Sequence, residues 1–196
     1  MKTTKPKPQI PLPTIAEVDK MLNQWNSAKN TLHEKAIELL FVNKFSTNTV
    51  PEEILIKVIV LNQLYSTNII NVTAMAQHIT KLNIDARLKQ GDTTLVNDIA
   101  TGHGIKNKNG KEINFYSFAT KYCCMHQPNL YPIYDSLVEK VLKHFQNGNF
   151  NFKTADLKDY NKFIQIIKDF QKAYGLQKYT LREIDIYLWL TGKKYF

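Results

Sequence analysis

Asp135 is the residue whose setting points most directly to chemistry. It ends the segment Pro132-Ile-Tyr-Asp135 and opens a helix with a single apolar face, made of Leu137, Val138, Val141, Leu142 and Phe145. A carboxylate at this end of a helix stays ionised, because the helix dipole favours negative charge there. It can stabilise positive charge that develops on a substrate, or orient and deprotonate a water molecule. The alternative role is an ordinary N-cap, and the two roles are compatible.

Lys121 and Ser117 precede this carboxylate in one predicted helix. Their spacing of four residues puts both side chains on one helix face, one turn apart. A lysine becomes a nucleophile when an apolar pocket lowers its pKa, and Phe118, Tyr122 and Cys124 are near enough in sequence to supply one. The alternatives are a solvated lysine at the helix edge and a serine bonded to its own backbone.

Two further polar stretches are candidates for binding. One is the turn that follows a strongly apolar segment, with Gln63, Tyr65, Ser66 and Asn68. The other is the loop over residues 101–111, with His103, Lys106, Lys108 and Lys111. Lysines on such a loop would contact the phosphates of a nucleic acid. The alternatives are ordinary turn residues and a solvated surface loop.

The composition narrows the class of protein. The chain has 196 residues with 26 Lys and Arg against 17 Asp and Glu, a net charge of +9 that favours a polyanionic partner. Its hydrophobic fraction of 43% excludes a disordered tail. Cys123 and Cys124 are adjacent and cannot build a disulfide framework or a four-cysteine metal site. With His126 they lack the usual ligand spacing, so neither a metal nor a cofactor is expected.

The pattern of Pro and apolar residues predicts how the chain is organised. Residues 1–13 are expected to form a flexible basic arm, and residues 14–196 a single all-α domain that acts as a monomer. No apolar stretch is long enough for a membrane helix, so a cytoplasmic protein that avoids membranes is expected. Thr14 with Glu17, and Thr180 with Glu183, have capping-box spacing. Helices are predicted at about 14–25, 31–41, 51–64, 69–82, 92–100, 112–126, 135–146, 160–174 and from 181 onward.

Two segments within residues 51–142 resemble the helix-hairpin-helix DNA glycosylase superfamily (HhH-GPD). Leu61, Gln63, Ser66 and Thr67 match the turn that follows a buried helix in that family, and Pro132-Ile-Tyr-Asp135 is similar to its Pro-Ile-x-Asp motif. The resemblance implies a two-lobed all-α architecture with a central cleft for double-stranded DNA that carries a lesion or a mismatch. It also implies that Asp135 is the carboxylate that assists hydrolysis of the N-glycosidic bond of an extruded base.

The sequence departs from this family in two ways besides lacking its iron–sulfur loop. The family's Gly-x-Gly hairpin, whose N–H groups hold a DNA phosphate, would fall near residues 113–116, where no Gly stands. Gly102-His-Gly104 lies too early unless residues 106–111 are an insertion. Members with a covalent intermediate carry a Lys eighteen positions before the Asp, where this chain has Ser117. A monofunctional hydrolase is therefore expected, with lyase activity only if Lys121 is the nucleophile.

Two alternative functions remain open from the sequence. The fold could serve as a non-catalytic module that binds nucleic acid, which the missing hairpin glycines favour. It could also be a helical interaction protein whose basic faces meet an acidic partner.

Overall fold

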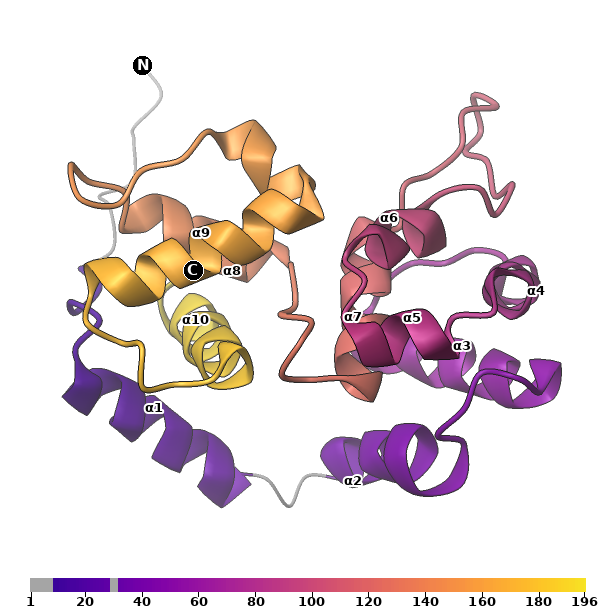
Figure 1. The fold of residues 1–196 in the computed structure, drawn as a ribbon, viewed down its shortest axis with the longest axis horizontal. Coiled ribbons are helices and arrows are strands. Elements are labelled where there is room, and N and C mark those ends of the chain that lie inside the picture. The colour runs from indigo at the N-terminus through magenta and orange to yellow at the C-terminus, as the bar shows by residue number, and fades with distance from the viewer. Residues whose placement is uncertain (1–8, 29–31) are drawn as a thin grey trace.

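The computed structural model describes residues 9–28 and 32–196, and within these ranges the chain is all-α, as predicted (Figure 1). Most of the predicted basic arm, residues 1–8, lies outside the described residues. The only β-type pairings found in the described ranges are isolated bridges, Lys106 with Glu112 and Asn147 with Phe150. The helices are α1 (Ile15–Ala28), α2 (Leu32–Glu38), α3 (Pro51–Tyr65), α4 (Val72–Leu82), α5 (Asp85–Gln90), α6 (Thr94–Ala100), α7 (Tyr116–His126), α8 (Ser136–His144), α9 (Tyr160–Ala173) and α10 (Leu181–Tyr195). A π-helical turn, η1 (Leu39–Lys44), follows α2, and a short 3-10 helix, η2 (Thr154–Lys158), precedes α9.

The helices gather in two groups (Figure 1). Helices α1, α8, α9 and α10 form one group, in which α10 packs against both α1 and α8. Helices α2 to α7 form the other, held together mainly by the contacts of α3 with α4 and of α6 with α7. The chain passes from the first group to the second after α1 and returns through residues 127–135, which lead to α8. The two ends of the described chain therefore share one group, and α6 touches α9 across the two.

Local sequence signals place most of the helix starts. Thr14 accepts a hydrogen bond from the N–H of Glu17, and Thr180 forms the predicted capping box with Glu183. Pro51 occupies the first turn of α3. The amphipathic faces of α8 and α9 supply many of the buried side chains of their group.

Three helices differ from the prediction. Helix α5 was not predicted, because its six residues are too few to show a helical period. Helix α7 begins at Tyr116 rather than near residue 112, because Glu112 instead pairs with Lys106 in the preceding loop. Helix α3, whose apolar sequence predicts a helix buried on most sides, instead exposes Ile56 and Ile59.

Lys57 fixes the connection between η1 and α3. Its side chain is 0% exposed, and Nζ donates hydrogen bonds to the carbonyls of Phe45 (3.0 Å) and Thr47 (2.7 Å) and to Oδ1 of Asn48 (2.7 Å). Tyr122 of α7 also donates to Oδ1 of Asn48, at 2.6 Å. One buried ammonium group thus bonds to three acceptors of a connection that has no regular structure.

Candidate functional site

A cavity of about 670 Å³ lies between the two groups of helices. Helices α1, α3, α7 and α10 line it, together with the start of α2 and the residue that caps α8. Its polar lining includes Glu34, Tyr65, Lys121, Asp135, Arg182 and Asp185. Lys121 and Asp135, which the sequence singled out separately, therefore meet in one cavity.

Lys121 lies on the buried side of α7, with 6% of its surface exposed. Its Nζ donates a hydrogen bond to Oγ of Ser117 at 2.6 Å, which confirms that the two side chains share a face. The contact forms because a long helical side chain leans toward the N-terminus of its own helix. Burial lowers the pKa of Lys121 below its ordinary value, although the negative charges of Asp135 and Asp185 act in the opposite direction.

Asp135 is the N-cap of α8, as one of the sequence alternatives predicted. Its Oδ1 accepts hydrogen bonds from the N–H groups of Leu137 and Val138, both at 2.9 Å. Both bonds end on Oδ1, so the cap does not use Oδ2, and the carboxylate also lines the cavity. The capping role is therefore compatible with a second role toward a ligand.

Arg182 and Asp185 of α10 face the same cavity and were missed by the sequence analysis. Nη1 of Arg182 lies 2.6 Å from Oδ2 of Asp185, which is only 2% exposed. Burial raises the pKa of Asp185 to about 6, against the opposing effect of Arg182. A signal was present in the sequence, because Asp185 interrupts the otherwise apolar run Ile184-Asp-Ile-Tyr-Leu188, and Asp is rarely fully buried without a partner.

Aromatic side chains form part of the cavity wall. Trp25 of α1 and Trp189 of α10 meet edge to face, with ring centroids 6.0 Å apart. The guanidinium carbon of Arg182 lies 6.0 Å from the Trp25 ring centre, and Nζ of Lys193 lies 5.0 Å from that of Trp189. With Tyr65, these rings offer flat apolar surfaces beside charged groups.

The residues predicted for binding are spread over several places. Tyr65 lines the cavity, whereas the neighbouring positions Gln63, Ser66 and Asn68 are exposed at the end of α3. Ser66 and Asn68 adopt positive φ angles of 48° and 59°, so the predicted turn after the apolar helix is present.

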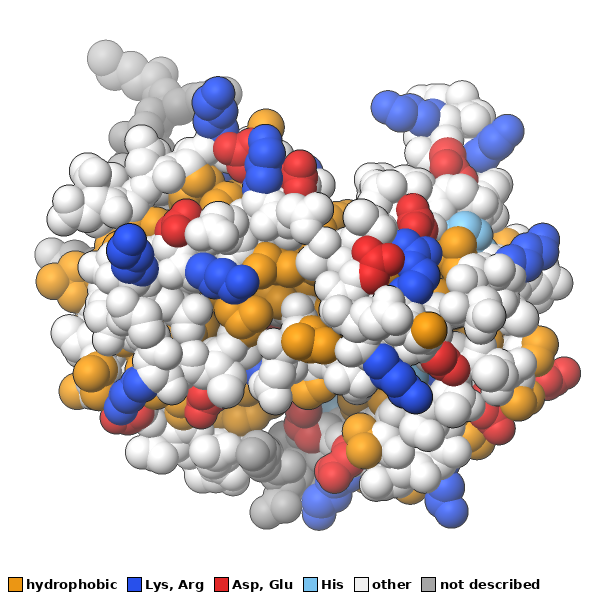
Figure 2. All heavy atoms as spheres, in the orientation of Figure 1, with side chains coloured by type: hydrophobic (Ala, Val, Ile, Leu, Met, Phe, Trp, Pro, Cys, Tyr) orange, Lys and Arg blue, Asp and Glu red, His pale blue; other side chains and the backbone are white. Residues whose placement is uncertain are grey.

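The basic loop between α6 and α7 projects from the second group of helices, and Figure 2 shows blue side chains at its tip. Lys106, Lys108 and Lys111 are exposed there. His103 differs from them: it is buried at the base of the loop, where Nε2 donates to the Ala100 carbonyl (3.1 Å) and Nδ1 accepts from the Ile105 N–H (3.0 Å). As placed, His103 holds the loop and does not present its ring to a phosphate.

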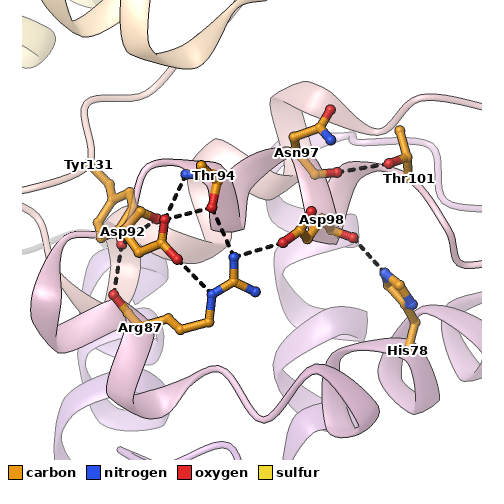
Figure 3. A network of polar contacts seen from close by, with 8 residues as sticks. All are labelled: His78, Arg87, Asp92, Thr94, Asn97, Asp98, Thr101 and Tyr131. Atoms are coloured by element: carbon orange, nitrogen blue, oxygen red, sulfur yellow. Dashed lines mark hydrogen bonds and ion pairs between the residues drawn. The ribbon is translucent and has the colours of Figure 1, made fainter.

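A second charged cluster lies away from the cavity (Figure 3). Arg87 of α5 bonds to Asp92 through Nε and to Asp98 through Nη2, both at 2.7 Å. The hydroxyl of Tyr131 donates to the carbonyls of Arg87 and Asp92, and His78 bonds to the carbonyl of Asp98. These charged groups are paired with one another and join α5, α6 and the connection to α8, so we assign the cluster a structural role.

Cys123 and Cys124 are both buried free thiols, and burial raises the pKa of Cys124 to about 12. Within the described ranges, no three His, Cys, Asp or Glu side chains come together as a metal site. In the same part of the chain, no helix combines the length and the apolar character that crossing a membrane requires.

Comparisons with known proteins identify one protein family and one similar protein. The HI_0787_N family, described as an N-terminal domain, matches residues 17–130, which is more than half of the chain. An uncharacterized protein of Haemophilus influenzae is 44% identical over 152 residues, which cover 76% of this chain and 71% of that protein. The family match includes Ser117 and Lys121 and ends before Asp135. No solved structure matches the chain significantly.

Proposed function

We propose that this chain, which belongs to the HI_0787_N family, binds double-stranded DNA and removes a damaged or mismatched base in the manner of a helix-hairpin-helix glycosylase. The observation that carries the proposal is the meeting of Lys121 and Asp135 in one cavity. The volume of about 670 Å³ is in the range of small-molecule sites and leaves room for an extruded nucleotide.

The position of the Lys121 amine supports a covalent mechanism over simple hydrolysis. Lys121 stands one helical turn after Ser117, yet its Nζ reaches the Ser117 hydroxyl. Ser117 is the position at which the resemblance expects a nucleophilic Lys. A side chain that leans back by one turn therefore brings an amine to that place from a displaced residue.

The cavity groups can divide the chemistry between them. The free amine of Lys121 would attack C1′ of the sugar while the C1′–base bond breaks. The base would leave with the electron pair of that bond and take up the proton that the attacking nitrogen loses. The carboxylate of Asp135 would stabilise the positive charge that develops on the sugar ring. Trp25, Trp189 and Tyr65 would provide surfaces on which the extruded base stacks.

The structure of the loop after α6 supports the alternative in which Gly102-His-Gly104 belongs to the hairpin and residues 106–111 are an insertion. The N–H of Ile113 donates to the carbonyl of Ile105 at 3.0 Å, so residues 106–112 form an excursion closed at its base. Without this excursion, Gly102-His-Gly104 would stand shortly before α7, where the resemblance expects the hairpin glycines. The cavity between two groups of helices supports the proposal by offering a place between them where a duplex could be held.

A trapping experiment tests the proposal. The protein is incubated with a panel of duplexes that carry oxidised, deaminated, alkylated or mismatched bases, with and without borohydride. We expect base release on at least one duplex and a covalent protein–DNA adduct that Lys121→Ala abolishes and Asp135→Asn strongly slows. Lys168→Ala, on the exposed side of α9, is the matched control and keeps wild-type activity.

The other outcomes separate the rival functions. Base release without an adduct would support the monofunctional hydrolase with Asp135 as the carboxylate. DNA binding with neither release nor adduct on any duplex would refute the enzyme and favour a non-catalytic nucleic-acid-binding module. Absence of DNA binding even at low salt would leave a helical protein-interaction function.

A further inference from the structure

Glu112 occupies an unusual place at the base of the projecting loop. Its Oε1 accepts a hydrogen bond from the N–H of Gly104 at 2.8 Å, and the N–H of Gly102 also acts on this carboxylate. Gly104 and Gly102 together hold the pKa of Glu112 below its ordinary value. The Gly104 N–H thus bonds directly to this anionic group, and the Gly102 N–H adds a favourable interaction with it.

The backbone of this segment has the positive φ angles that are typical of an anion-binding nest. Gly102 and Gly104 have φ angles of +79° and +75°, a conformation that turns neighbouring N–H groups toward one point and that glycine adopts most readily. His103 between them is anchored from below by the Ala100 carbonyl and the Ile105 N–H. Such nests bind phosphate groups as readily as carboxylates.

The group in the nest is exchangeable. The Glu112 side chain is 36% exposed, and it extends from a loop that also carries the exposed lysines Lys106, Lys108 and Lys111. The loop therefore attracts anions toward a nest that one of its own carboxylates fills. A carboxylate and a phosphate oxygen cannot accept from the same N–H groups at full strength, so an incoming phosphate must displace Glu112.

We propose that Glu112 is a built-in competitor: its carboxylate fills a phosphate site made by the Gly102 and Gly104 N–H groups, and a phosphodiester of nucleic acid displaces it on binding. The proposal specifies a regulation of the DNA contact and rests on the proposed function for the identity of the nucleic acid. Because Glu112 must be displaced first, the protein binds DNA less tightly than it would if the nest were unoccupied. In the free protein the glycine N–H groups hold Glu112, and in the complex they hold a phosphate of the nucleic acid instead.

Binding to an undamaged duplex tests this inference without any chemistry. Fluorescence anisotropy is measured for wild type, Glu112→Ala and Glu112→Gln, with Asp169→Asn of α9 as an exposed control that makes the same change in net charge. We expect Glu112→Ala to bind about tenfold more tightly than wild type, since hydrogen bonds to charged groups are among the stronger ones. Glu112→Gln keeps the shape of the side chain and is expected to bind about threefold more tightly. Asp169→Asn is expected to change affinity by less than either.

The amide resonances of Gly102 and Gly104 give a direct readout. In wild type, duplex DNA is expected to shift both resonances as Glu112 leaves, and in Glu112→Ala inorganic phosphate alone is expected to do so. Affinities of both Glu112 variants equal to that of Asp169→Asn, or glycine resonances that DNA does not move, would overturn the inference. Because the duplex is undamaged, these results stand whether or not the protein releases bases; absence of DNA binding in all variants would overturn this inference and the DNA-binding proposal together.

Discussion

Lys57 and Lys121 are both buried lysines, on the neighbouring helices α3 and α7, and their surroundings differ. The Lys57 ammonium has three oxygen acceptors between 2.7 and 3.0 Å, from a connection that needs donors. The Lys121 ammonium donates to one neutral hydroxyl and faces a cavity. Burial lowers the pKa of both, and that of Lys57 to about 8.

This difference teaches how to separate a structural lysine from a candidate nucleophile. A lowered pKa is common to both and does not distinguish them. What distinguishes them is whether the ammonium has its full set of acceptors and whether a substrate can approach. By this criterion Lys57 stabilises the fold, whereas Lys121 is poorly compensated and accessible from the cavity.

Removing the Lys57 charge should have the largest effect on stability. We expect Lys57→Met to lower the free energy of unfolding by about 3 kcal/mol, because the Phe45 and Thr47 carbonyls lose the Lys57 donor and the buried Asn48 amide oxygen keeps only Tyr122. Urea denaturation followed by circular dichroism measures this change. A loss below about 1 kcal/mol would remove the contrast between the two lysines.

Replacing Lys121 by Met should not destabilise the fold, in contrast to the same substitution at Lys57. We expect Lys121→Met to leave the free energy of unfolding unchanged or to raise it by about 1 kcal/mol, since an apolar side chain replaces a poorly compensated buried charge. The borohydride adduct should be lost completely. Destabilisation equal to that of Lys57→Met would mean that Lys121 is structural as well.

Asp185 should control the pH at which Lys121 becomes reactive. Its negative charge raises the pKa of Lys121, so Asp185→Asn should lower that pKa further and move the midpoint of reductive methylation of Lys121 to lower pH. The other charged or titratable residues that line this cavity remain in place in this variant: His33, Glu34, Tyr65, Asp135, Arg182, Lys193 and Lys194. Peptide mass spectrometry across a pH series measures the midpoint, with Asp169→Asn as the control. If the two variants share one midpoint, Asp185 does not act on Lys121.

The exposed lysines of the loop should have the smallest effect on the fold. Replacing Lys106, Lys108 and Lys111 together by Ala should change the free energy of unfolding by less than about 0.5 kcal/mol. The salt dependence of DNA binding should become shallower by about 0.9 in log–log slope for each phosphate that the protein no longer neutralises. An unchanged slope would place the DNA-binding surface elsewhere on the protein.

The sequence predicted those parts of the structure that short-range rules control. The caps at Thr14, Asp135 and Thr180 involve residues two or three positions apart, and all three are present. The shared face of Ser117 and Lys121 follows from helical spacing and is confirmed by their hydrogen bond. Such features need no knowledge of the rest of the chain.

The parts that were missed depend on distant residues. Asp185 and Arg182 become cavity residues only because α10 packs near Lys121 and Asp135, which lie far from it in sequence. Helix α7 begins late because Glu112 is drawn into the preceding loop by Gly104. In both cases a contact outside the helix's own period decides the outcome. The sequence signals that Asp185 needs a partner, but it does not show which elements will surround it.

The packing of α1 against α10 has a consequence for how the protein is made. Trp25 and Trp189 meet at the cavity although they lie near opposite ends of the described chain. Helices α2 to α7 form a contiguous stretch that can fold on the ribosome as it emerges. The cavity wall, by contrast, cannot close until α10 has left the exit tunnel. The part of the cavity wall that faces Lys121 is therefore completed only after α10 has emerged.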